Sequence, residues 1–321
     1  MKSPYKFLFL FLMVASTCMV LSSSNWLTTW MGLEINMLGF IPLMYLKETT
    51  NESETAAKYL VPQALGSTIF IASATTSLYL NNLQILMPIA MCLKLGAAPF
   101  HFWFPSVMAG LPLLPAFLLL TWQKIAPIFA ICSFSPTLST KILPIAGISA
   151  LWGGIGGLNQ TDIRSLLTYS SIAHTGWMLA SISSPTPTLS IYIGAYILIT
   201  VSIYTTLTNH STKHHKQLFS PKEPYQSFLL SITILSLGGL PPFVGFVMKL
   251  LVLYHTEASM LIILTLISGA MMSLLYYLSL TFSPLLSLNK TYFTSTKMIS
   301  KSSIMFLLSQ ILPLSFILFY F

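Results

Sequence analysis

Long apolar stretches alternate with short polar connections along almost the whole chain. Most stretches are close to the roughly 20 residues that a helix needs to cross a bilayer. Eleven can be delimited, at residues 4–21, 26–46, 58–80, 83–108, 112–133, 139–158, 162–182, 188–209, 226–255, 259–282 and 302–320. The connections carry Ser, Thr, Asn and Pro, and none is long enough for a separate soluble domain. The pattern predicts an all-α polytopic membrane protein with about 11 transmembrane helices in a single membrane domain, residues 1–321.

Composition supports the same class. Hydrophobic residues make up 55% of the chain and charged residues 7%, against about 25% charged in a typical soluble domain. These values exclude a soluble globular protein, a disordered chain and a nucleic-acid-binding protein. Cys18, Cys92 and Cys132 lie inside apolar stretches and form no CxxC pair, so neither a disulfide framework nor a zinc site is predicted. Residues 1–21 resemble a signal peptide, but they lead directly into another apolar stretch, so we expect a retained first helix.

The positive charges predict an orientation. When the connections are assigned alternately to two faces, one face receives only Lys141. The other face receives the remaining eleven Lys and Arg residues of the connections, namely Lys2, Lys6, Lys47, Lys58, Arg164, Lys213, Lys216, Lys222, Lys290, Lys297 and Lys301. Cytoplasm-like faces of membrane proteins carry such an excess of Lys and Arg. We therefore expect the N-terminus on the positive side of the membrane and the C-terminus on the opposite side.

Four charged residues fall inside apolar stretches: Glu34, Lys94, Lys124 and Lys249. A charge at the bilayer centre costs on the order of 3 kcal/mol on the insertion scale. A lysine near the end of a helix can extend its ammonium to the headgroups. Lys124 is about twelve residues from either end of its stretch, and Glu34 has a short side chain near the middle of its own. We therefore interpret the four residues as functional.

Two of the stretches also contain helix-breaking sequences at membrane depth. In residues 94–105, Gly and Pro follow Lys94, and in residues 238–249 they precede Lys249. Broken helices at corresponding positions of two halves indicate a transporter built from inverted repeats, with its site near the midplane. The approximate repeats are residues 1–135 and 139–282, followed by a C-terminal helix at 302–320.

These residue types suit proton movement. Burial generally disfavours the charged form of a lysine, and a nearby carboxylate favours it, so a lysine that gains and loses such a partner takes up and releases a proton. Glu34 is the only acid deep in a stretch, which makes it the expected partner of Lys94. Lys124 would then be the next carrier and Lys249 the last. For His101 and His174, two interpretations stay open: part of the relay, or packed and hydrogen-bonded membrane histidines.

Six motifs in order carry a resemblance to a known family. They are Trp30–Met37 (WMGLEINM), Lys94–Trp103 (KLGAAPFHFW), Thr121–Pro127 (TWQKIAP), Gly156–Gln160 (GGLNQ), Tyr169–Trp177 (YSSIAHTGW) and Leu237–Phe243 (LGGLPPF). Over residues 25–255 the chain resembles the subunit 2 family of mitochondrial NADH–ubiquinone oxidoreductase, respiratory complex I. That family is antiporter-like and related to subunits of sodium/proton antiporters, and its animal members are short by three helices relative to bacterial ones.

The resemblance implies roles for the buried charges. Glu34 matches a glutamate that pairs with a lysine, Lys94 matches that lysine, Lys124 matches the central lysine, and Lys249 matches the basic residue of the second broken helix. His174 lies in a family motif whose role is less settled. The chain would be a membrane-arm subunit of an H⁺-translocating NADH:ubiquinone reductase, without redox chemistry of its own.

The resemblance also implies a cellular location and partner subunits. We expect the mitochondrial inner membrane, with the N-terminus in the matrix. The expected partners are other membrane subunits, especially subunits 4 and 4L, together with lipids. FMN, iron–sulfur clusters and ubiquinone would belong to other subunits, so this chain would hold no cofactor and no metal.

Three other functions are compatible with a polytopic helical chain. The first is a subunit of a free-standing Na⁺/H⁺ antiporter of the same fold, which would transport without a redox partner. The second is a haem-bearing electron carrier, which needs histidine pairs facing each other, and the spacing of His101, His174 and His255 does not favour it. The third is a membrane scaffold, in which substitution of the buried charges would be silent.

Overall fold

The computed structural model describes residues 4–45, 50–77, 84–134, 136–210 and 224–287. Within these ranges all regular structure is helical apart from short turns. The helices are α1 Pro4–Ser22, α2 Trp26–Met44, α3 Thr50–Thr76, α4 Leu86–Leu95, α5 Trp103–Gly110, α6 Leu113–Leu120, α7 Trp122–Cys132, α8 Pro136–Gly157, α9 Ile163–Ser181, α10 Thr186–His210, α11 Pro224–Gly238, α12 Val244–His255 and α13 Met260–Ser287. The fold class predicted from the hydrophobic pattern, an all-helical membrane fold, is therefore confirmed.

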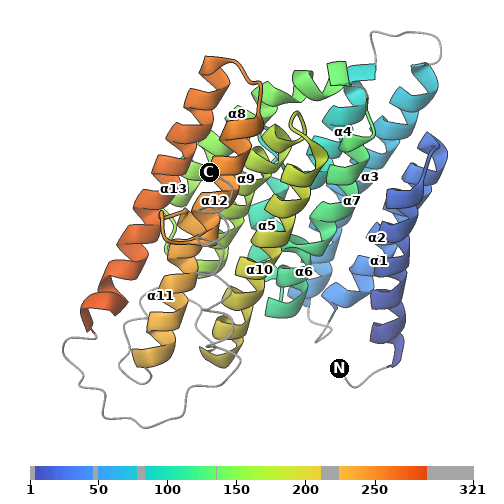
Figure 1. Ribbon diagram of the computed structural model, residues 1–321. Helices are drawn as coiled ribbons and strands as arrows, with labels where there is room; N and C mark the ends of the chain where they lie inside the picture. The colour runs from blue at the N-terminus through green and yellow to red at the C-terminus, as the bar shows by residue number, and fades with distance from the viewer. Residues whose placement is uncertain (1–3, 46–49, 78–83, 135, 211–223, 288–321) are drawn as a thin grey trace.

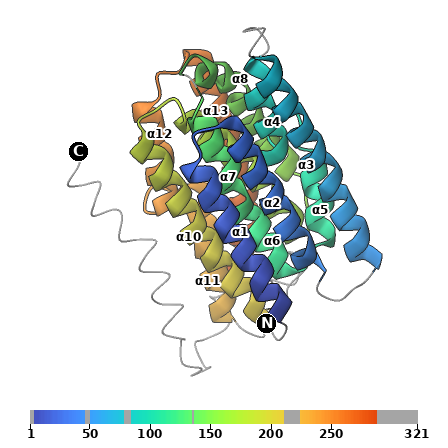
Figure 2. The same ribbon diagram turned by 90° about the vertical axis from the view of Figure 1, so that its right-hand side faces the viewer.

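The helices form one bundle in which most run roughly alongside their neighbours (Figure 1). Helices α1 and α2 pack together at one edge, and α13 packs on α8 at the opposite edge. Turning the bundle by 90° brings α1 and α2 to the front (Figure 2). Helix α9 lies in the interior and contacts α5, α8, α10, α12 and α13.

Every predicted stretch from 4–21 to 259–282 contains helix, and the stretch at 302–320 lies outside the described residues. Four segments are long and apolar enough by themselves to cross a membrane: Tyr5–Ser22, Leu113–Cys132, Pro187–Thr208 and Met260–Phe282. This finding shows helical membrane character, while the number eleven stays a prediction. Helix α3 begins at Thr50, within the charged connection expected before residue 58, and its Thr55 packs against Gly110 of α5.

Both predicted helix breaks are present. Helix α4 ends at Gly96, whose φ of 68° places it in the left-handed region, and α11 is followed by Gly239 with a φ of 82°. Glycine adopts such a φ without the steric cost that a Cβ would add. A third interruption, between α6 and α7 at Thr121, was not predicted. The Phe117 carbonyl oxygen accepts both the Thr121 backbone N–H at 3.1 Å and the Thr121 hydroxyl at 2.8 Å.

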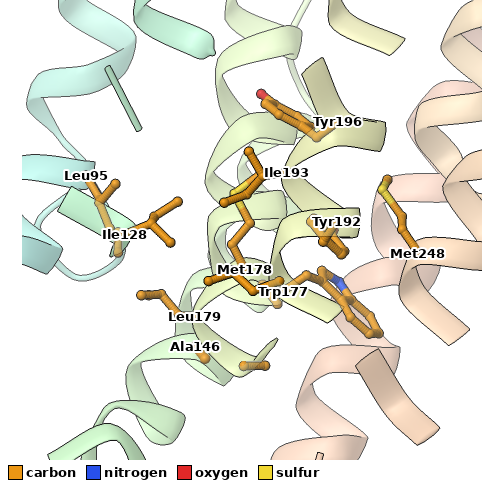
Figure 3. Close-up of a cluster of buried hydrophobic side chains, with 14 of the residues drawn as sticks. Leu95, Ile128, Ala146, Trp177, Met178, Leu179, Tyr192, Ile193, Tyr196 and Met248 are labelled. Carbon is orange, nitrogen blue, oxygen red and sulfur yellow. The ribbon is translucent and has the colours of Figure 1, made fainter. Parts of the chain in front are cut away.

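The hydrophobic core surrounds α9. Its residues 170–181 are all buried, although they include His174 and several Ser and Thr residues. Figure 3 shows α9 residues Trp177 and Met178 beside Tyr192 and Ile193 of α10, with Leu95 and Ile128 on the far side. A helix that is buried all round is typical of the centre of a large protein. Polar side chains on α9 must therefore find partners inside the protein.

Candidate functional site

The three lysines of the apolar stretches are all buried. Lys94 on α4, Lys124 on α7 and Lys249 on α12 have exposed fractions of 5%, 4% and 8%. Glu34, on α2, is only partly buried in this chain. Buried charges are normally paired, hydrogen-bonded or in contact with water. The surroundings of each lysine therefore decide what it can do.

Lys94 lies at the C-terminal end of α4, where the last carbonyl groups of the helix need external donors. Gln63 of α3 donates from Nε2 to the Lys94 carbonyl oxygen at 2.9 Å, and Trp103 Nε1 donates to the Leu93 carbonyl oxygen at 3.2 Å. Helices α3 and α4 can approach closely at Gly66 because glycine has no side chain. A Cβ there would lie only 2.8 Å from Lys94 Cγ. The break is thus stabilised by side chains, and the Lys94 side chain is held against α3.

A cavity connects Lys94 to Lys124. It provides about 20 Å³ for the centres of water molecules, and roughly 10–15 Å³ on this measure is enough for one water. Its polar lining includes both lysines and four uncharged side chains, Asn36, Tyr59, Gln63 and Gln123. A buried water needs two to four polar partners, and this lining supplies them. The cavity can therefore hold water between the two lysines.

Gln123 forms hydrogen bonds with two other uncharged residues that line the cavity. Its Nε2 donates to Asn36 Oδ1 at 3.3 Å, and its Oε1 accepts from the Tyr59 hydroxyl at 3.4 Å. The sequence reasoning missed these residues because it searched for charges. One signal was available: Gln123 immediately precedes Lys124, and Asn36 is two residues after Glu34. Their positions within the two motifs could have nominated them.

Lys124 has no carboxylate within 4 Å among the described residues. Its Nζ donates to the Ser171 carbonyl oxygen of α9 at 3.0 Å. The ammonium also lies 5.0 Å from the centroid of the Tyr196 ring and 5.8 Å from that of Phe104. Aromatic faces attract a cation within about 6 Å of their centroid. A carbonyl dipole and two rings therefore stabilise its charged form.

His174 lies between the second and third lysines. Its Nδ1 is 2.8 Å from the Tyr192 hydroxyl, and the backbone of Leu237 at the end of α11 also acts on the imidazole. The ring interacts electrostatically with both Lys124 and Lys249. Of the two histidines considered from the sequence, this one is placed among the lysines.

His101 has different surroundings. It lies in the break between α4 and α5, where its ring stacks on Phe102 and Trp152 at centroid distances of 4.4 and 6.0 Å. It does not line the cavity. Phe102 and Trp152 are both exposed on the surface of the bundle. His101 itself is buried beside these exposed rings, and it lies outside the cavity that both Lys94 and Lys124 line.

Lys249 is bound to the second break itself. Its Nζ donates to the Gly238 carbonyl oxygen at 2.9 Å, next to Leu237, whose backbone acts on His174. Gly239 leaves room for this approach because it has no side chain. A Cβ there would lie 3.3 Å from Lys249 Nζ. A Cβ on Gly245 would collide with the Ser236 carbonyl oxygen. The start of α12 therefore packs directly on the backbone that ends α11.

The expected pairing of Glu34 with Lys94 is not an ion pair here. Among the described residues no contact within 4 Å joins them, although Glu34 still acts electrostatically on Lys94. The reason is the face of α2 that carries Glu34: its neighbours Met31, Ile35 and Leu38 are exposed. Among the acids in the described residues, the buried one is Glu52, at the first turn of α3.

No metal site is evident in the described ranges. Within them, no three His, Cys, Asp or Glu side chains gather closely enough to hold a metal ion. The expectation that cofactors belong to other proteins stays a prediction.

Comparison with known proteins identifies relatives over most of the chain. A family described as "NADH:quinone oxidoreductase/Mrp antiporter, TM" matches residues 23–83 and 73–275. NADH-ubiquinone oxidoreductase chain 2 of Lumbricus terrestris is 39% identical over 293 residues, which cover 88% of this chain and 87% of the relative. The protein of the same name from Oryctolagus cuniculus is 37% identical over 332 residues, 95% of each chain.

Solved structures share the fold. A chain of respiratory complex I from Thermus thermophilus with bound aureothin superposes with a TM-score of 0.78 at 24% identity, covering 87% of this chain and 70% of that one. A chain of the Mrp complex from Dietzia sp. DQ12-45-1b gives a TM-score of 0.71 at 16% identity, covering 89% and 60%. At these identities the likeness concerns the fold alone.

Proposed function

Because the chain belongs to the NADH-ubiquinone oxidoreductase chain 2 family, within the NADH:quinone oxidoreductase/Mrp antiporter proteins, we propose that its buried lysines form a proton relay in the membrane arm of that oxidoreductase. The relay runs from Glu34 and Lys94 through the cavity to Lys124, and then past His174 to Lys249. His101 is not needed for it. Enzymatic activity belongs to the whole complex, and this chain contributes translocation.

One observation carries the proposal: a single cavity is lined by both Lys94 and Lys124. Water in that cavity gives a proton a path between two groups that can each hold it. Beyond Lys124, the path continues along α9, because Ser171 binds Lys124 and His174 is one turn further on the same face. His174 then faces α11, whose terminal carbonyl binds Lys249. Lysine side chains, His174 and backbone carbonyl oxygens of α9 and α11 would line this route through the apolar bundle.

The test uses Lys124, which has an oxygen partner but, in the described part of the chain, no carboxylate within 4 Å. Lys124→Arg keeps a positive charge that does not release its proton, and Lys124→Met removes the charge. Both variants should lose NADH-driven proton pumping in sealed inner-membrane vesicles. Coupled NADH oxidation should also slow, because the relay works against a membrane potential worth roughly 2.3 kcal/mol per charge per 100 mV.

Lys141→Arg is the matched control, since Lys141 is exposed at the start of α8. It should pump at the parent rate. Complex assembly is measured first for every variant. If Lys124→Arg assembles and pumps normally, Lys124 is a fixed charge and the relay is refuted at that position.

We further propose that the exposed face around Glu34 is covered by a neighbouring membrane subunit, expected to be subunit 4L or subunit 4. A carboxylate on a lipid-facing surface is costly, and Met31, Ile35 and Leu38 surround Glu34 with exposed apolar area. A cysteine introduced at Ile35 should cross-link to that neighbour in the assembled complex. The same change at Leu261, on the far edge of the bundle, should not give this product. Glu34→Gln should reduce pumping while preserving assembly.

The orientation and span count are part of the same proposal. The chain would cross the mitochondrial inner membrane eleven times, with its N-terminus in the matrix and with repeats at 1–135 and 139–282. A C-terminal tag should be accessible to protease from the intermembrane side. A tag that is protected there, with access from the side of residues 211–223, would contradict eleven crossings.

The alternative, a free-standing Na⁺/H⁺ antiporter subunit, has weaker support. The Mrp relative shares the fold at 16% identity, whereas chain 2 proteins reach 39%. Co-migration of the chain with a large NADH-oxidising assembly separates the two functions.

A further inference from the structure

Gln123 links α7 to three other helices beside the cavity. Its Nε2 donates to Asn36 Oδ1 of α2 at 3.3 Å and to Met13 Sδ of α1 at 3.3 Å. Its Oε1 accepts from the Tyr59 hydroxyl of α3 at 3.4 Å. A thioether sulfur can only accept, so the amide nitrogen of Gln123 is the atom that faces Met13. All three partners are buried, and both N–H groups and the oxygen of this amide are therefore engaged.

The start of α7 places this amide beside Lys124. The helix begins directly after the interruption at Thr121, and the Lys124 backbone N–H donates to the Thr121 carbonyl oxygen, three residues earlier, at 3.3 Å. Pro127 has no N–H, so the Gln123 carbonyl oxygen lacks the donor that a helix normally supplies four residues later. Pro127 lines the same cavity. The first turn of α7 thus brings a lysine and a neutral amide to one cavity.

Between its two lysines the cavity is polar but uncharged. Among the described residues that line it, none is an acid. The polar lining includes three amides and one phenol, namely Asn36, Gln63, Gln123 and Tyr59. A nearby carboxylate favours the charged form of a lysine, whereas an amide binds water through neutral donors and acceptors. Water beside these groups can therefore pass a proton from one lysine to the other without a carboxylate that would hold it.

We propose that Gln123 is a positioning residue for proton transfer between Lys94 and Lys124: it holds Asn36 and Tyr59 against the cavity and keeps the passage free of charge. This inference rests on the proposed relay. Because Asn36 Oδ1 accepts from Gln123, the N–H groups are the part of the Asn36 amide that can bind water in the cavity. The Tyr59 hydroxyl donates to Gln123, so its oxygen accepts from such water. Gln123 thereby orients the groups that bind the water, without carrying the proton itself.

The first test removes the amide. Gln123→Leu in the assembled complex should preserve NADH oxidation in the presence of an uncoupler. Proton pumping in sealed inner-membrane vesicles should fall about tenfold, because misplaced groups slow a transfer step steeply. Asn36→Leu should give a similar loss, and the double variant should pump no worse than either single variant if the two amides act together. Gln160→Leu is the matched control, since Gln160 also donates at 3.3 Å but does not line the cavity. It should pump like the parent.

The second test keeps the shape of the side chain and adds a charge. Gln123→Glu retains an acceptor for Tyr59 but places a carboxylate between Lys94 and Lys124. Both lysines should then release protons only at higher pH, so the pH profile of pumping should shift to higher pH. The titratable groups around these lysines in the described ranges come from five other helices or breaks, namely Glu34, Tyr59, His101, His174 and Tyr196. A loss that came from disturbed packing alone would leave the pH profile unchanged.

The outcomes separate this inference from the relay. Normal pumping by Gln123→Leu, or an unchanged pH profile in Gln123→Glu, would overturn the role of Gln123 while a loss of pumping in Lys124→Arg still supports the relay. Additive losses in the double variant would also overturn it. Normal pumping by assembled Lys124→Arg would refute the relay at that position, whatever the Gln123 variants show. If Gln123→Leu does not assemble, the isosteric Gln123→Glu decides.

Discussion

The two broken helices hold their lysines in different ways. In α4 and α5, Lys94 precedes the break, and its side chain lines a cavity while its carbonyl accepts from Gln63. In α11 and α12, Lys249 follows the break, and its ammonium donates to the carbonyl of Gly238. A left-handed glycine lies at each break. Two similar helix breaks therefore hold their lysines differently. Lys94 can contact water in the cavity, whereas Lys249 is bound to a backbone carbonyl oxygen.

This difference shows what a helix break can provide. Ending a helix leaves carbonyl groups without intrahelical donors. At the first break, side chains of α3 and α5 supply donors, which leaves the Lys94 ammonium available to the cavity. At the second break, Lys249 itself is the donor. We infer that Lys94 exchanges protons through water, whereas Lys249 does so only when its bond to Gly238 rearranges.

The largest expected effect contrasts the packing of the two breaks. Gly245→Ala places a methyl group against the Ser236 carbonyl oxygen, which is backbone and cannot move aside. We expect a loss of about 3 kcal/mol of stability, the upper end of the usual cost of overpacking. Gly96→Ala forces alanine into a left-handed φ, which costs about 1–2 kcal/mol. The yield of assembled complex on native gels should therefore fall much more for Gly245→Ala.

Gly194→Ala is the control for both changes, because a Cβ on Gly194 meets no atom within 4 Å. It should assemble like the parent. Equal yields for Gly245→Ala and Gly96→Ala would show that the second break is not more tightly packed than the first.

A smaller effect separates the two lysines by stability. Lys249→Met removes the donor to the Gly238 carbonyl, and an unsatisfied buried acceptor costs about 1–3 kcal/mol. Lys94→Met leaves the carbonyl groups at its own break satisfied by Gln63 and Trp103. Both variants should lose pumping, but only Lys249→Met should inactivate at a clearly lower temperature. A reversed order of inactivation temperatures would contradict the distinction between the two breaks.

The cap on the first break has a smaller effect still. Gln63→Leu removes one hydrogen bond to the Lys94 carbonyl, which should cost about 1 kcal/mol. Gln160→Leu is its control, because Gln160 donates at 3.3 Å in a partly exposed turn. Thermal inactivation of the assembled complex measures both. No difference between them would show that water, and not Gln63, satisfies this carbonyl.

The smallest effect is expected at the surface. Lys58 and Glu54 form an exposed ion pair one turn apart on α3, with N and O 2.6 Å apart. Exposed pairs contribute little to stability. Glu54→Gln should leave assembly and pumping unchanged, in contrast to Glu34→Gln. A pumping defect in Glu54→Gln would show that a charge near the start of α3 also contributes to pumping.

Much of the architecture follows from local sequence. The length and hydrophobicity of each stretch predict a membrane helix, since backbone groups in lipid must be hydrogen-bonded within the segment. Gly and Pro clusters located the breaks beside Lys94 and Lys249, because both residue types oppose a continuous helix. The interruption at Thr121 escaped prediction, since its stretch contains no such cluster there.

By itself, the sequence determined which charged residues lie within apolar stretches, namely three lysines and one glutamate. Only the tertiary structure decided their partners. Glu34 lies on a face with exposed neighbours, Lys124 binds a carbonyl of α9, and Gln123, an uncharged residue, lines the cavity beside the lysines. The reason is physical: the cost of burying a charge is local, whereas its compensation comes from helices far apart in sequence whose packing brings them together.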